Sequence, residues 1–312
     1  MKRIDAFIFA PENARRLATL RIGLFALLAL RMTITDFAFV ADQPKALFDP
    51  VSLFHLLGQM PSSGVVHVVQ PIAVVAALLA AAGLWPRLTF PLAFAAAVFL
   101  ELMLNATGKI VHNEVVLILS LIPLLAVPTA ACRTWTITDL LRRRSTSPAP
   151  EGPAYGWPIR MAMVIVGLAY LIAGLQKLRY SGVDWFTTDN LRYVLWSSSD
   201  ARSSPNELGL FIADHAALAH LLAAGTILLE VSFIACVPFA KLRWVMVPSV
   251  VALHVGIRLM MGLDYSAQWL TVVIVFVNWP WLADAISRHR HRGKPDGFPQ
   301  RLAQEATSRA DA

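Results

Sequence analysis

The chain consists largely of apolar runs that are long enough to cross a membrane. Eight such runs can be drawn, at residues 16–40, 65–84, 88–105, 110–128, 158–178, 214–238, 242–262 and 266–283. A helix rises about 1.5 Å per residue, so about 20 residues cross the roughly 30 Å of hydrocarbon in a bilayer. Proline-containing turns such as Trp85-Pro86-Arg87 and Trp279-Pro280-Trp281 separate the runs. The sequence therefore predicts an all-α, polytopic membrane helix bundle of about eight transmembrane helices.

The composition supports the same fold class and argues against several others. Hydrophobic residues make up 57% of the chain and charged residues only 15%, whereas soluble domains carry about 25% charged residues. The net charge of +7 comes from basic residues placed between apolar runs, which indicates membrane topology rather than nucleic-acid binding. Cys132 and Cys236 lie far apart in no metal-binding spacing, and no helix-borne histidine pair is present. We therefore expect neither a disulfide framework nor a bound metal, unless the fold brings His112, His254 and Glu114 together as ligands.

Lysine and arginine residues divide unevenly between the two sides of the predicted bundle. With eight spans, most of them fall on the side of the termini and of the loop 129–157. The other side holds only Lys45, Lys109, Lys177, Arg179, Arg192, Arg202 and Arg258. Positively charged loops stay in the cytoplasm, so we expect cytoplasmic termini and a multi-pass position in the cell (inner) membrane. Residues 1–15 are expected to lie at the interface, 16–283 to form the transmembrane domain, and 284–312 to form a basic, disordered tail.

One lysine stands at the end of an apolar run, inside the stretch Tyr170–Trp185 (YLIAGLQKLRYSGVDW). Lys177 has two interpretations. Its ammonium could reach water at the membrane surface while its alkyl stem lies in hydrocarbon. Alternatively, an apolar pocket could favour its neutral amine and make it a functional base. The other ionisable residues bear on this choice.

Charged residues inside the apolar runs fall at two depths. Arg21 and Glu230 are expected near the inner face, where we predict a structural ion pair between them. A larger group is expected near the outer face, together with Lys177, and could line a polar pocket open to the extracytoplasmic side. Its members are Arg31, Asp36, Glu101, His112, Asn113, Glu114, His254 and Arg258. If Arg31 pairs with Asp36 or Glu101, the residues of that ion pair would have a purely structural role.

Several stretches resemble one membrane family. The opening Ala14-Arg15-Arg16-Leu17-Ala18-Thr19-Leu20-Arg21 is similar to the start of the HTTM domain, which is shared with vitamin K-dependent gamma-carboxylase. Tyr170-Leu171-Ile172-Ala173-Gly174-Leu175-Gln176-Lys177 resembles the family's segment around its base, and the Glu230–His254 region and Asn278-Trp279 are also similar. The resemblance covers about residues 10–283.

The resemblance implies a role for three residues. Lys177 would be the catalytic base that deprotonates a reduced naphthoquinone, a vitamin K-type quinol. Oxygenation of the quinol would then give a strong base that removes a proton from a glutamate side chain, to which carbon dioxide adds. His112 and Asn113 match the family's pair of residues that stabilise the reacting anion, here in reversed order. Gln176 stands where the carboxylases carry a first lysine.

Three interpretations of function remain open from the sequence, the third being a membrane anchor whose buried charges form only structural pairs. The first is a quinol-dependent enzyme of the carboxylase or epoxidase type that acts in the lipid bilayer, without the lumenal domain that docks protein substrates in animal carboxylases. The second is a non-enzymatic membrane protein: a transporter, an immunity factor or a subunit that binds a membrane or peptide partner. Dependence on Lys177 and on a bound quinone separates the first from the other two. No nucleic-acid partner is expected.

Overall fold

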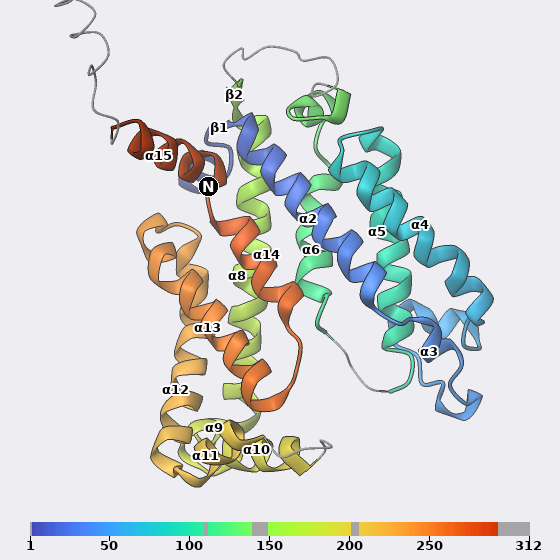
Figure 1. The fold of residues 1–312 in the computed structure, drawn as a ribbon, viewed down its shortest axis with the longest axis vertical. Coiled ribbons are helices and arrows are strands. Elements are labelled where there is room, and N and C mark those ends of the chain that lie inside the picture. The colour runs from blue at the N-terminus through green and yellow to red at the C-terminus, as the bar shows by residue number, and fades with distance from the viewer. Residues whose placement is uncertain (1, 109–111, 139–148, 201–205, 293–312) are drawn as a thin grey trace, which may run out of the picture. The chain divides into compact units, whose positions relative to one another are not determined.

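A computed structural model describes residues 2–108, 112–138, 149–200 and 206–292, which are mainly helical (Figure 1). The α-helices are α1 (Lys2–Ile8), α2 (Ala14–Ile34), α3 (Ala38–Ala41), α4 (Ser63–Ala81), α5 (Pro86–Leu104), α6 (Val115–Leu125), α8 (Pro153–Ser181), α9 (Asp184–Thr187), α10 (Asn190–Asp200), α11 (Glu207–Asp214), α12 (Ala216–Ser232), α13 (Arg243–Met261), α14 (Ser266–Phe276) and α15 (Trp279–Arg292). Short 3-10 helices are η1 (Lys45–Leu47), η2 (Ser52–Leu57), η3 (Thr129–Arg133), η4 (Phe233–Cys236) and η5 (Ala240–Leu242), and the strands are β1 (Glu12–Asn13) and β2 (Glu151–Gly152).

Six helices of the described residues are long and apolar enough to cross a membrane. These are α2, α4, α5, α8, α12 continued through η4, and α13 preceded by η5. A seventh span results if α14 and α15 are counted as one, and α6 has only 11 residues. The predicted helical membrane bundle is confirmed. The count of eight spans and the cytoplasmic position of the termini stay predictions.

The starts of α2 and α8 are held side by side by a short antiparallel ladder. Glu12 pairs with Gly152 and Asn13 with Glu151, immediately before the two helices begin. The side chain of Asn13 also accepts a hydrogen bond from the backbone N–H of Arg15, which caps α2. Pro153 occupies the first turn of α8, where its missing N–H costs no helical hydrogen bond. Local sequence thus fixes where these two spans start.

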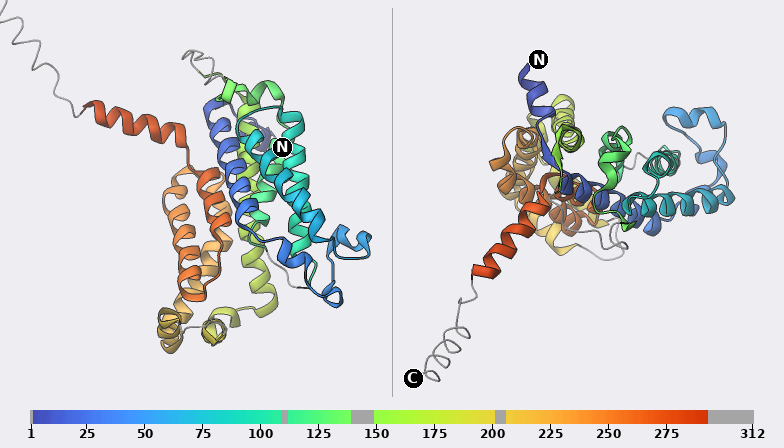
Figure 2. Two further views of the ribbon diagram at one scale, coloured as in Figure 1. Left: turned by 45° about the vertical axis from the view of Figure 1, so that its right-hand side comes forward. Right: turned by 90° about the horizontal axis from the view of Figure 1, so that it is seen from above.

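Helix α8 brings the two sides of the transmembrane unit together. It packs against α2 and α6 on one side and against α12 and η4 on another, while α14 contacts α2, α6, α8 and α13 (Figures 1 and 2). Helices α8 and α12 approach closely at Gly174, where an added Cβ would lie 2.8 Å from Val231 Cγ2. Small residues allow membrane helices to approach in this way. This approach positions the polar residues described below.

Residues 278–312 form a separate compact unit, of which 278–292 are described. Helix α15 continues to Arg292, so the expected disordered tail is wrong for residues 284–292. The rest of the predicted tail, at 293–312, lies outside the described residues, as do Lys109, Arg202 and residues 139–148 of the predicted linker.

Candidate functional site

Lys177 does not end freely in solvent. Its Nζ donates to Oε1 of Glu230 on α12, and the two side chains are 25% and 9% exposed. The ammonium also lies 5.5 Å from the centre of the Trp185 ring. The structure therefore places Lys177 in a half-buried ion pair between two spans, beside an aromatic ring.

The predicted ion pair between Arg21 and Glu230 is wrong. Arg21 is buried on α2, away from Glu230. Its guanidinium donates hydrogen bonds to the backbone carbonyls of Cys132 and Trp135. From the sequence, we expect Glu230 near the inner face, at the depth of Arg21. Helices α8 and α12 are offset along their axes (Figure 1), and Glu230 comes level with Lys177.

Two buried polar atoms beside this pair are without partners. Among the described residues, neither Oε2 of Glu230 nor the hydroxyl of Tyr170 has a hydrogen-bond partner. The Tyr170 ring lies 4.9 Å from that of Phe233, which follows Glu230 by one helical turn. Burying such atoms without a partner is costly. An unsatisfied acceptor and an unsatisfied hydroxyl in the same part of the bundle are groups that a polar ligand would complete.

His254 on α13 extends the site towards α14. The imidazole is buried, and its ring centre lies 5.9 Å from that of Tyr170 and 5.7 Å from that of Tyr265. Its Nε2 lies 3.0 Å from Oε1 of Gln268, and the amide nitrogen of Gln268 donates to the carbonyl oxygen of His112 over 3.2 Å. The name Lys177 site is used below for Lys177, Glu230, Tyr170, His254 and Gln268.

A second group of charges forms the Arg31 cluster, which consists of Arg31, Glu114, Asp264 and Arg258. The buried guanidinium of Arg31 donates two hydrogen bonds to Oε1 of Glu114 and one of 3.0 Å to Asp264. Arg258, which is largely exposed, lies 3.3 Å from the other oxygen of Asp264. Burial alone would raise the pKa of Asp264, but hydrogen bonds from Ser266 and from Arg31 outweigh it and lower this pKa.

The remaining predicted pocket residues are only partly brought together by the structure. Arg31 pairs with Glu114 and Asp264 rather than with Asp36 or Glu101. Glu101 is buried on α5 within electrostatic range of Glu114 and Arg31. Asp36 is exposed and accepts a hydrogen bond from the backbone of Phe39, because α2 ends at Ile34 before reaching it.

Of the predicted catalytic residues, His112 is the one whose backbone joins the Lys177 site. Its carbonyl accepts from Gln268, and its exposed ring lies 5.7 Å from that of Tyr265. Asn113 is partly buried at the next position. The sequence-based prediction did not include Tyr170. A signal existed, because Tyr170, Gly174 and Lys177 follow a spacing of four and three that places them on one helix face.

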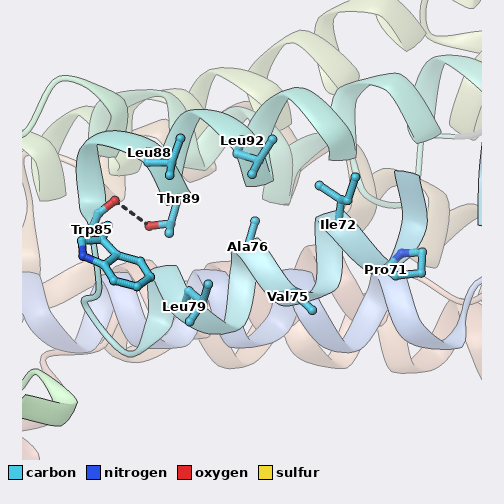
Figure 3. Close-up of a pocket in the computed structure, with 9 residues that line it drawn as sticks. All are labelled: Pro71, Ile72, Val75, Ala76, Leu79, Trp85, Leu88, Thr89 and Leu92. Atoms are coloured by element: carbon cyan, nitrogen blue, oxygen red, sulfur yellow. Dashed lines mark hydrogen bonds between the residues drawn. The ribbon is translucent and has the colours of Figure 1, made fainter. Parts of the chain in front are cut away.

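Two pockets lie outside these groups. One of about 360 Å³ opens between α4 and α5, and its lining is apolar apart from Thr89 (Figure 3). The Thr89 hydroxyl already donates to the carbonyls of Leu84 and Trp85, so this groove suits a hydrocarbon chain rather than a reacting polar group.

The second pocket has a volume of about 340 Å³. Its lining includes Ser181, one helical turn beyond Lys177, together with Asp184, Thr188, Asp189, Asn190 and Tyr193. A hydrogen bond from Arg192 lowers the pKa of Asp189 there.

Metal ligands are not assembled in the part of the chain that the structure describes. No group of three or more His, Cys, Asp or Glu side chains is placed to hold an ion there. Cys132 and Cys236 are both free and buried.

The fold and the Lys177 site define a polytopic helical membrane protein with a half-buried lysine–carboxylate pair between its spans. The model of one family, the HTTM domain, matches residues 9–281, and the chain belongs to this family. A search of curated protein sequences and a search of solved structures each gave no match.

Proposed function

We propose that this HTTM-domain protein is a membrane enzyme that uses Lys177 to deprotonate a weakly acidic, lipid-soluble hydroxyl compound, a reduced naphthoquinone. The observation that carries the proposal is the Lys177–Glu230 pair with the second oxygen of Glu230 buried and unsatisfied. We place the site towards the extracytoplasmic side of the cell membrane, as the distribution of lysine and arginine predicts.

The pair can release a neutral amine without help from water. In a low-dielectric environment the two charges are costly, and transfer of one proton removes both. Lys177 Nζ passes a proton to Glu230 Oε1, and the resulting amine can accept the proton of a ligand hydroxyl. The half-buried position of Lys177 and its apolar surroundings on α8 support this exchange.

The residues present fit an aromatic ligand that carries hydroxyl groups. Trp185 lies beside the Lys177 ammonium, and Tyr170 is buried on the same face of α8, about two turns before Lys177. A hydroxyl could donate to Glu230 Oε2, and an oxygen of the ligand could accept from the Tyr170 hydroxyl, which would satisfy both orphaned atoms. When bound, a reduced naphthoquinone would supply the acidic hydroxyl and, with oxygen, the stronger base that carboxylation requires.

The test compares two substitutions of Lys177 in purified protein reconstituted with reduced naphthoquinone. Lys177→Ala should lower quinol consumption by about 10²- to 10⁴-fold, the usual contribution of a general base. Lys177→Arg keeps a cation beside Glu230 but cannot lose its proton, so it should be equally inactive while unfolding like the wild type. Arg179→Ala, two positions further on the same helix, is the matched control and should keep activity.

The contrary results are specific. Full turnover in Lys177→Arg would exclude Lys177 as the base. Failure of the wild-type protein to bind or consume any quinol, together with a normal fold in Lys177→Ala, would favour a non-enzymatic membrane protein. Identification of the lipophilic quinones that co-purify in mild detergent gives an independent readout of the proposed ligand.

A further inference from the structure

His254 is placed so that both of its ring nitrogens face oxygen atoms. Nδ1 lies 2.9 Å from the carbonyl oxygen of Val250, and Nε2 lies 3.0 Å from Oε1 of Gln268. A carbonyl oxygen only accepts hydrogen bonds, so each contact requires a proton on the histidine nitrogen. A neutral imidazole carries one ring proton and can satisfy one of these contacts but not both.

The orientation of the Gln268 amide is fixed by its other contact. Its nitrogen faces the carbonyl oxygen of His112 at 3.2 Å. Exchanging the oxygen and nitrogen of the amide would relieve a neutral His254, but it would set two acceptors against each other at His112. The three contacts are His254 with Val250, His254 with Gln268, and Gln268 with His112. Each of them contains a donor only if both ring nitrogens of His254 carry a proton.

The resulting cation is buried and has no anionic partner in the part of the chain that the structure describes. Tyr170 from α8 and Tyr265 before α14 meet the ring at nearly right angles, at 81° and 72°. Arg258, one turn further on α13, is a second cation, and Asp264 is bound to Arg31, Arg258 and Ser266. Glu230 is paired with Lys177. A buried charge of this kind is costly unless a counter-charge joins it.

We propose that His254 is held as an imidazolium by Val250 and Gln268 and that it binds the anionic oxygen of a ligand in the Lys177 site. The inference rests on the proposed function for the ligand class, an aromatic hydroxyl compound that loses its proton. His254 is thereby the positive group for the product of deprotonation, and Gln268 is a positioning residue that sets its charge. Pairing with an anion would supply the missing counter-charge.

The charge of His254 can be measured without any ligand. Nitrogen NMR of histidine-labelled protein in lipid nanodiscs distinguishes an imidazolium from either neutral tautomer, and His254→Gln identifies the signal. Near neutral pH we expect the imidazolium. Gln268→Leu removes one acceptor while leaving His254 in place, and the signal should move to a neutral tautomer. A neutral His254 in the wild-type protein would overturn the proposal.

Ligand binding tests the second part of the proposal, the contact between His254 and an anionic oxygen of the ligand. The probes are a hydroxynaphthoquinone whose ring hydroxyl is ionised at neutral pH and its methyl ether, which is neutral, each followed by quenching of tryptophan fluorescence. The wild type should prefer the anion, and His254→Gln should weaken anion binding by about tenfold or more, leaving the ether unaffected. Equal binding of both probes to the wild type would refute the anion contact but not the proposed function, whereas binding of neither would refute both.

Discussion

The two charged groups of the transmembrane unit differ in how completely their members are paired. In the Arg31 cluster, the guanidinium groups of Arg31 and Arg258 face the carboxylates of Glu114 and Asp264, so the charges of these four members balance. The nearby carboxylate of Glu101 is not a member of the cluster, and its two buried oxygens have no hydrogen-bond partner among the described residues. In the Lys177 site, one carboxylate faces one ammonium, and buried polar atoms of Glu230 and Tyr170 are left without partners. The doubly protonated His254 proposed above would add a further positive charge.

This difference separates a structural role from a chemical one. A charge buried in a bundle is tolerated when its partners satisfy it, and a satisfied group has no remaining capacity for a ligand. The Arg31 cluster joins α2, the start of α6 and the turn before α14, and therefore fixes helix positions. The Lys177 site retains unused hydrogen-bonding capacity, which is expected of a site that completes itself with a ligand.

The largest expected effect is on stability and breaks the Arg31 cluster. Arg31→Met leaves the buried carboxylate of Glu114 without its cation, and we expect a loss of about 3–5 kcal/mol in the free energy of unfolding. Arg258→Met is the matched control, because its exposed side chain contributes at most about 0.5 kcal/mol. Equilibrium unfolding in mixed micelles measures both. Equal losses in the two variants would contradict a structural role for the cluster.

A smaller effect is expected where α8 meets α12. Gly174→Ala places a Cβ 2.8 Å from the side chain and 3.2 Å from the backbone nitrogen of Val231, so the helices must separate, at a cost of about 1–3 kcal/mol. The separation should also weaken the Lys177–Glu230 pair and reduce quinol consumption. Gly225→Ala on α12 meets nothing within 4 Å and should be neutral or stabilising by up to about 1 kcal/mol. Activity unchanged in Gly174→Ala would show that the pair tolerates displacement.

The smallest expected effect on stability belongs to Tyr170→Phe. The hydroxyl has no hydrogen-bond partner among the described residues, so its removal should change the free energy of unfolding by less than about 0.5 kcal/mol. Binding of the hydroxynaphthoquinone should nevertheless weaken by about threefold to tenfold, the worth of one hydrogen bond. A large loss of stability would mean that the hydroxyl supports the fold rather than a ligand.

The sequence by itself determined the membrane bundle, because the length and apolar character of a run are local properties that a bilayer selects directly. It also singled out Lys177, which ends such a run, and Arg31, Glu114 and His254, which are polar inside them. The tertiary structure decided which of these residues meet. Glu230 pairs with Lys177 rather than with Arg21 because α8 and α12 are offset along their axes, a quantity that residue counting within single spans does not contain. Gln268 gains its role only because α14 lies between α13 and the start of α6, where one amide can reach both His254 and the backbone of His112.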